Sequence, residues 1–152
     1  MRKVCTVFGL TVTILAAAAS NAFAGGVTQA NGQGQTPLSA SLGFNAKSDL
    51  EGSLNYNADP KGANAGFSAH CNDYLTYTQT TTKGGLPKVV VTAACTDQDG
   101  KTVYLRAGFI DRGEPGVNDW LCIVWNYTAP REKGAFIHDM GLIQNGNIQI
   151  HT

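Results

Sequence analysis

The sequence predicts an all-β domain, an antiparallel β-sandwich or partly closed barrel of about eight short strands. Short segments in which apolar and polar residues alternate recur along the chain, separated by turns rich in Gly, Asp, Asn and Pro. After the N-terminal segment, no long stretch has the period of about 3.6 residues that marks an amphipathic helix.

Residues 1–24 have the pattern of a signal peptide. Arg2 and Lys3 precede an apolar run from Val4 to Ala19, and Ala22-Phe23-Ala24 offers small residues for cleavage. A run of about 16 apolar residues is shorter than the roughly 20 that span a bilayer, so export is expected and a membrane anchor is not. We therefore predict a secreted protein, extracellular or periplasmic, with no membrane span after cleavage.

The remaining 128 of the 152 residues are enough for one domain. Residues 25–40 are rich in Gly and Gln, so a flexible lead-in is expected there, followed by a single β domain over residues 41–152. Nine Lys and Arg stand against eleven Asp and Glu in this part of the chain, without a basic block. This balance argues against binding to nucleic acid.

The first half of the domain supplies four predicted strands. Residues 42–46 and 54–57 alternate apolar and polar and are joined by turn-favouring residues, so they are expected to form a hairpin. Residues 67–77, rich in aromatic residues and Thr, predict a third strand, and Val89 to Cys95 is the clearest strand of the chain. Asp97-Gln98-Asp99-Gly100 then predicts a tight turn into the next strand.

A second hairpin is centred on an acidic turn that starts at Asp111-Arg112-Gly113-Glu114-Pro115-Gly116. The preceding strand alternates, whereas Trp120 to Trp125 is apolar throughout, as in a strand buried on both faces. The tail predicts short strands at 135–140 and 141–144. Asn145-Gly146 is then expected as a two-residue hairpin turn before a last strand at 147–150.

Three cysteines remain after cleavage. Cys71 and Cys95 lie equally far from residue 83, within a segment rich in Thr and Gly, so a chain reversal there would place them face to face on neighbouring strands. In an oxidising compartment they are predicted to form a disulfide. Cys122, in the middle of an apolar strand, is expected to be a buried free thiol. The alternative, a reactive nucleophile, would need an activating neighbour, and no histidine is close in sequence.

The acidic turn is the strongest candidate for a ligand site. Asp111, Glu114, Asn118 and Asp119 offer oxygen ligands of the kind calcium prefers. Their spacing matches no standard calcium loop. The simpler interpretation is that Asp111 and Asp119 bond turn amides while Glu114 is solvated, so no metal site is predicted. Asp97 and Asp99 are expected at the opposite end of the intervening strand.

No catalytic residue and no cofactor site are predicted. The spacing of His70, His138 and His151 is not that of zinc ligands. Ser68, His70 and Asp73 show no arrangement in which a base is oriented toward a nucleophile.

Tyrosines offer a different class of function. Tyr56, Tyr74, Tyr77 and Tyr127 could line a sheet face that stacks on sugar rings or packs on a partner protein, because tyrosine combines apolar area with a polar tip. The alternative is that half of them fill the core.

Several of these segments together resemble the post-COAP domain family of secreted bacterial proteins. The resemblance rests on Leu42-Gly43-Phe44-Asn45, the cysteines at 71 and 95, the Asp-Arg-Gly-Glu-Pro-Gly turn with Asp119, and the closing segment 146–151. It covers Ser41 to Thr152 and implies a small extracellular all-β domain, found alone or appended to larger secreted proteins, with no established activity. Cys122 has no counterpart in that pattern.

The expected function is therefore that of a secreted binding or structural module, with an extracellular protein or a glycan as its partner. The alternative is a small secreted hydrolase whose acid and base come from distant turns. A concave cleft with converging polar groups would favour the enzyme, and an exposed aromatic patch would favour the binding module.

Overall fold

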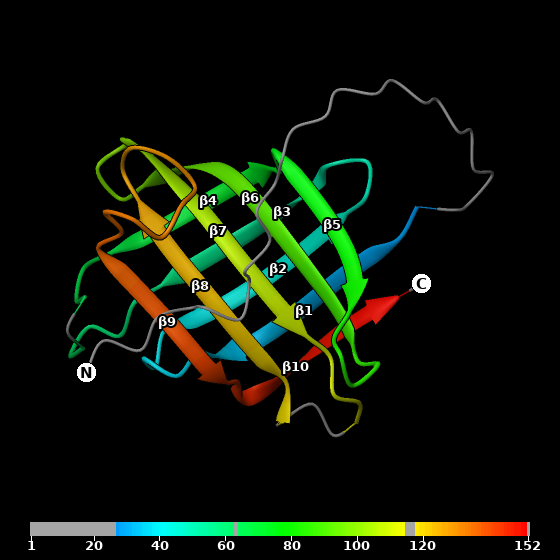
Figure 1. Cartoon of the computed structure of the whole chain (residues 1–152). Helices are drawn as coiled ribbons and strands as arrows, with labels where there is room; N and C mark the ends of the chain where they lie inside the picture. The colour runs from blue at the N-terminus through cyan, green and yellow to red at the C-terminus, as the bar shows by residue number, and fades with distance from the viewer. Residues whose placement is uncertain (1–26, 63, 115–117, 152) are drawn as a thin grey trace.

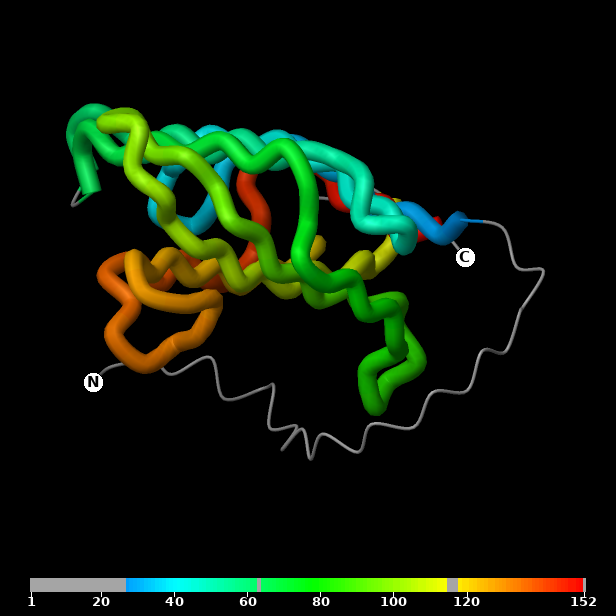
Figure 2. The backbone as a smooth tube through the Cα atoms, turned by 90° about the horizontal axis from the view of Figure 1, so that it is seen from above, coloured from blue at the N-terminus to red at the C-terminus, as the bar shows by residue number. Residues whose placement is uncertain are grey.

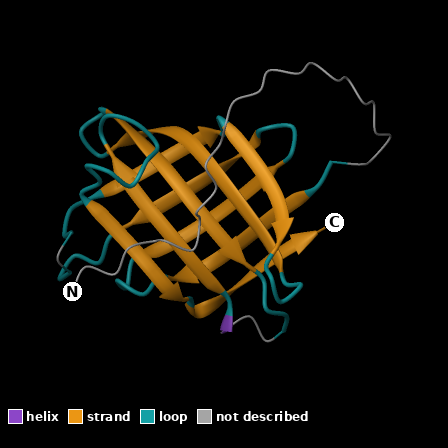
Figure 3. Ribbon diagram, in the orientation of Figure 1, coloured by secondary structure: helices purple, strands orange, loops and turns teal. Residues whose placement is uncertain are grey.

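The computed structural model describes residues 27–62, 64–114 and 118–151, and every structural statement below refers to them. The predicted signal peptide and residues 115–117 of the acidic turn lie outside this part. Ten strands form one antiparallel sheet that curls into a barrel-like shape (Figures 1 and 3), which confirms the all-β fold class. They are β1 (Gln29–Gln35), β2 (Ser41–Lys47), β3 (Glu51–Asn57), β4 (Ser68–Asp73), β5 (Thr76–Thr81), β6 (Pro87–Asp97), β7 (Thr102–Ile110), β8 (Trp120–Asn126), β9 (Ile137–Leu142) and β10 (Gln144–His151).

The sheet folds into two layers that face each other (Figure 2). The strand order is β10-β1-β2-β3-β4-β6-β7-β8-β9, and β5 also pairs with β6. Strands of one layer, β1 to β3, cross behind those of the other, β6 to β9 (Figure 1). The two layers are joined at two corners. At one corner β4 pairs with β6, and at the other the chain runs from β9 into β10 through the single residue Ile143. No helix in this part of the chain is long and apolar enough to cross a membrane.

The core fills the space between the two layers. Phe44 on β2 stacks on Phe109 on β7, with ring centroids 3.9 Å apart, and so joins the layers. Tyr56 and Trp125 meet edge to face at 5.6 Å. Such aromatic pairs contribute about 0.5 to 1.5 kcal/mol beyond the area they bury.

The predicted hairpins of the central segments are confirmed. β2 pairs with β3, β6 with β7, and β7 with β8, each in antiparallel register. The alternating positions of β7, Val103, Leu105, Ala107 and Phe109, are all fully buried. β8 is buried from Leu121 to Asn126, as its unbroken apolar sequence predicts.

The predicted flexible lead-in over residues 25–40 is wrong for Gln29–Gln35, which form β1. This strand pairs with β2 on one side and β10 on the other. Its inward positions carry Ala30, Gly32 and Gly34, so it lacks the large apolar residues that usually mark a strand. The ring of Phe44 takes that space, because a Cβ on Gly32 would lie 2.6 Å from Phe44 Cε1.

The predicted hairpin turn at Asn145-Gly146 is also wrong. Both residues lie within β10, where the register against β1 shifts between Gln33 and Gln35. Asn145 has a φ of 50°, the left-handed conformation that an Asn-Gly pair adopts readily. Here that conformation forms a bulge inside a strand instead of a turn between two strands.

Candidate functional site

The predicted disulfide joins Cys71 on β4 to Cys95 on β6, with an S–S distance of 2.02 Å. The register His70↔Thr96 places the two cysteines directly opposite each other. Both side chains are buried in the core. The bond therefore ties the two layers together at the corner where β4 meets β6.

Cys122 is buried on β8 beside Trp120, Val124 and Met140. Its burial is confirmed, but the predicted free thiol is not, because no cysteine in the described part of the chain is free. An apolar strand pattern determines whether a cysteine is buried and not whether it is oxidised.

The acidic turn docks against the free edge of β10. Among the described strands β10 pairs only with β1, so the amides of Ile148 and Ile150 point away from that ladder. Asp119 Oδ2 accepts the Ile148 amide at 2.7 Å, and Asp111 Oδ2 accepts the Ile150 amide at 3.0 Å. The two carboxylates thus satisfy backbone donors that a neighbouring strand would otherwise satisfy.

The remaining oxygens of these carboxylates bind the turn itself. Asp119 Oδ1 accepts a hydrogen bond from the Arg112 amide, and Asp111 Oδ1 accepts one from the Gly113 amide, each at 2.8 Å. The predicted bonding of turn amides is therefore confirmed. Glu114 is exposed but not merely solvated, because its Oε1 accepts hydrogen bonds from two amide side chains of β10, at 2.7 and 3.1 Å.

Burial is the main cause that raises the pKa of Asp119, and the nearby charges of Asp111 and Glu114 add to it. The amides of Arg112 and Ile148 act in the opposite direction. Asp119 is fully buried. Its role is to hold β10 against the turn.

We expect millimolar calcium to leave the melting temperature unchanged. A calcium ion would have to displace the amide hydrogen bonds that occupy all four oxygens of Asp111 and Asp119. Scanning calorimetry with calcium, with a chelator, and with magnesium as the matched ion tests this. A rise in melting temperature that calcium alone produces and the chelator reverses would show a bound ion.

Asp97 and Asp99 lie at the other end of β7 from the acidic turn, as predicted. Asp97 Oδ1 accepts the amides of Asp99 and Lys101, and its Oδ2 accepts the hydroxyl of Tyr127 at 3.0 Å. Burial acts to raise the pKa of Asp97, but these hydrogen bonds and the charge of Lys101 together lower it. Asp97 therefore shapes the β6–β7 turn and anchors Tyr127.

The histidines are not brought together. His70, His138 and His151 are exposed on β4, β9 and β10. The ring nitrogens of His70 contact the side-chain oxygens of Asn55 and Asn72. Among the described residues no group of three or more His, Cys, Asp and Glu could hold a metal ion.

The expectation that half of the four tyrosines fill the core is confirmed, and the four do not form one exposed face. Tyr56 is fully buried, and Tyr74 is only 4% exposed, with its hydroxyl donating to the Ser53 carbonyl. Tyr77 packs partly against the core. Of the four, Tyr127 alone is exposed, at 46%.

Tyr127 instead belongs to an aromatic groove of about 440 Å³ at one end of the barrel. Phe136, 42% exposed, stacks on it with ring centroids 4.7 Å apart and an interplanar angle of 12°. The two residues flank the β8–β9 loop, which lies beside the β6–β7 turn (Figure 1). The aromatic groove is lined by Asn64, Ala65, Gly66, Phe67, Gln98, Asp99, Tyr127, Phe136 and Ile137.

Both exposed rings of the aromatic groove are anchored. Phe67, itself buried, meets Phe136 edge to face at 5.2 Å and packs on Trp125 of the core. The hydroxyl of Tyr127 is held by Asp97. Rings fixed in this way lose little conformational freedom when a ligand stacks on them.

A second surface feature is an array of uncharged side chains on the outer side of β10, β1, β2 and β3. The register aligns these residues in two rows across the strands. One row contains Gln149, Asn31 and Asn45, and the other contains Asn147, Gln33 and Asn55. We call these six residues the amide face.

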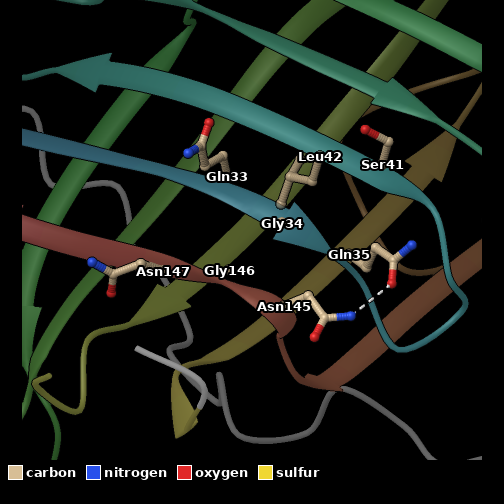
Figure 4. Close-up of a pocket in the computed structure, with 8 residues that line it drawn as sticks. All are labelled: Gln33, Gly34, Gln35, Ser41, Leu42, Asn145, Gly146 and Asn147. Atoms are coloured by element: carbon tan, nitrogen blue, oxygen red, sulfur yellow. Dashed lines mark hydrogen bonds between the residues drawn. The ribbon is translucent and has the colours of Figure 1, made fainter. Parts of the chain in front are cut away.

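A shallow depression of about 550 Å³ lies at one end of the amide face (Figure 4). Its floor is the bulge, where Gly34 and Gly146 bring the backbones of β1 and β10 close together. A Cβ on Gly146 would lie 2.1 Å from the Gln33 carbonyl oxygen. The depression is lined by Gln33, Gly34, Gln35, Ser41, Leu42, Asn145, Gly146 and Asn147.

Sequence reasoning missed both surfaces. Phe136 stands alone before a short strand, and its partner Tyr127 follows a different strand. The amide face was hidden because β1 was predicted to be flexible. Comparisons with protein-family models, with curated proteins and with solved structures found no match.

Proposed function

We propose that this chain is a secreted, non-catalytic binding module that holds a saccharide in the aromatic groove. The rigid, exposed stack of Tyr127 and Phe136 carries the proposal. A sugar ring presents apolar C–H faces, which pack on aromatic rings, and a rim of hydroxyls. Gln98 and Asp99 line the same groove and offer amide and carboxylate partners to such hydroxyls.

An extracellular or periplasmic location is part of the proposal. It is supported by the signal-peptide pattern of residues 1–24 and by a disulfide, which persists in oxidising compartments. The resemblance to the post-COAP domain family implies the same location and stays a prediction.

The alternative, a hydrolase, would need carboxylates free to exchange protons with a substrate. The three buried ones, Asp97, Asp119 and Asp139, instead accept hydrogen bonds from backbone amides or hydroxyls. This use of the buried acids supports a binding module.

Phe136→Ala and Tyr127→Ala are each expected to weaken saccharide binding about tenfold, since a stacking ring contributes about 1 kcal/mol or more. Tyr127→Phe keeps the ring but removes its bond to Asp97, so a smaller loss is expected. Calorimetric titration with a panel of soluble oligosaccharides measures these effects.

The matched control is Leu75→Ala, which removes an apolar side chain of similar exposure, 51%, away from the groove. It should bind like the wild type. Loss of binding in all variants alike, or turnover of the oligosaccharides by the wild type, would contradict the proposal.

A further inference from the structure

We propose that the amide face is a second binding surface, which takes an extended, uncharged polysaccharide. The inference rests on the proposed function for its ligand class, but different strands and different residues carry it. The aromatic groove would hold a sugar ring at the end of the barrel. The amide face would instead contact a polymer lying across the outer side of the sheet.

The charge of this surface points to an uncharged ligand. The six residues of the amide face are all Asn or Gln, and none of the described residues that line the depression is ionisable. The charged groups around the face lie at its border, where Glu114 accepts hydrogen bonds from Asn147 and Gln149 and where Lys47 pairs with Glu51. The six amides carry no charge of their own, and amide groups exchange hydrogen bonds with hydroxyls.

Two amides of the face are held in a fixed orientation. Glu114 Oε1 accepts hydrogen bonds from Asn147 Nδ2 and Gln149 Nε2. Because the carboxylate binds the nitrogen atoms, the carbonyl oxygen of the exposed Gln149 is left for other donors. Glu114 thus acts as a positioning residue at the border of the face.

Two acceptors on this surface have no hydrogen-bond partner among the described residues. Asn147 Oδ1, at the depression, and Asn45 Oδ1, in the neighbouring row, are buried without a hydrogen bond. A buried acceptor without a partner is unfavourable. Both atoms are closed to solvent, so a hydroxyl-bearing ligand can supply the missing donors only after the amide side chains turn outward.

The shape of the surface suits a chain. One row runs across β10, β1 and β2, and the other reaches β3 past Gly43; neighbouring strands lie about 4.8 Å apart. The glycines at the bulge leave the depression open at one end of the rows (Figure 4). A linear polymer could therefore contact several amides in succession, with its end or a side branch seated in the depression.

A pull-down with insoluble polysaccharides tests the inference: it measures how much protein cellulose, chitin and xylan remove from solution. Anionic polygalacturonate is the charged comparison. Gln33→Glu adds a charge in the middle of one row, and we expect it to weaken binding to the neutral polymer about tenfold, because the carboxylate must be desolvated. Thr78→Glu adds the same charge at an exposed position of β5 and should leave binding within about twofold of the wild type.

The outcomes separate the two proposals. If Phe136→Ala loses oligosaccharide binding while Gln33→Glu binds the polymer like the wild type, the amide face is overturned and the aromatic groove stands. If the wild type binds neither, both fall. Preference for polygalacturonate would overturn the inference, because the ligand would then be charged. Dimer formation that Gln33→Glu abolishes would also overturn it, because a second copy of the chain would then occupy the face.

Discussion

Replacing Cys71 and Cys95 together by alanine is expected to lower the free energy of unfolding by about 3.5 kcal/mol. The bond closes a loop with a sequence separation of 24. The chain-entropy relation gives a loop of that length a stabilisation of this size. Both side chains are buried, so lost packing adds to the loss. Alanine is chosen over serine because it places no hydroxyl in the apolar core.

Urea unfolding of the wild type and of the double variant measures the difference. The midpoint should fall strongly, and the slope should rise if the denatured chain, freed of its cross-link, expands. A thiol reductant should lower the midpoint of the wild type at least as far as the double substitution does, because it also acts on Cys122, which is not free. A loss below about 1 kcal/mol would mean that the link between β4 and β6 contributes little to stability.

The strands that could be predicted are those whose two faces differ in chemistry. Val103, Leu105 and Phe109 alternate with polar or small residues, and all three are fully buried. The symmetry of the two cysteines about residue 83 anticipated the register of β4 and β6. The first signal lies within one strand. The second links β4 to β6, between which the chain also forms β5, so the cysteines face each other without being joined by one hairpin.

β1 could not be predicted because its inward positions depend on another strand. Ala30, Gly32 and Gly34 carry little apolar surface of their own, and the ring of Phe44 fills the space above Gly32. The same holds for Asn145-Gly146, which forms a bulge only because β1 lies beside it. Local propensity favoured the left-handed backbone of this pair correctly, but it could not show that the pair would lie beside β1.

The candidate sites show the same division. The acidic turn was recognised, and the bonding of its own amides was expected. Its attachment to Ile148 and Ile150, however, joins residues 29 and 39 positions apart in the sequence. Tyrosine content allowed either an exposed aromatic face or tyrosines that fill the core. It could not show that Tyr74 is buried while Phe136 is exposed, because that depends on how loops pack at the end of the barrel.

Two fully buried aspartates, Asp119 and Asp139, show how the kind of donor decides whether a carboxylate can be replaced. Asp139 accepts the hydroxyls of Thr36 and Tyr56 and, at 3.0 Å, the amide of Leu38. A hydroxyl can turn and accept a hydrogen bond instead. Among the described residues, the side chain of Asp119 has backbone amides as its partners, and these cannot accept.

The pH dependence of Asp119 follows from its raised pKa. Its folded pKa lies above the unfolded value of about 3.9, so the folded state binds more protons between the two values. The stability that protonation contributes is fully present below the unfolded pKa and is lost as pH rises through the folded pKa. A protonated carboxyl can still accept both amides, because its hydrogen can point away from them.

Asp119→Asn is therefore expected to lower the free energy of unfolding by about 2 to 3 kcal/mol, because the new NH₂ group faces an amide donor and leaves it buried without an acceptor. Asp139→Asn should cost less than about 1 kcal/mol, since Oδ1 can serve the Leu38 amide while Nδ2 donates to a hydroxyl. Urea unfolding of the wild type and both variants, near neutral pH and near pH 4, measures these losses. The difference in the free energy of unfolding between the wild type and Asp119→Asn should grow as the pH falls, because the asparagine does not titrate. Equal losses at the two positions would show that lost charge, and not the direction of the hydrogen bonds, determines the role of these carboxylates.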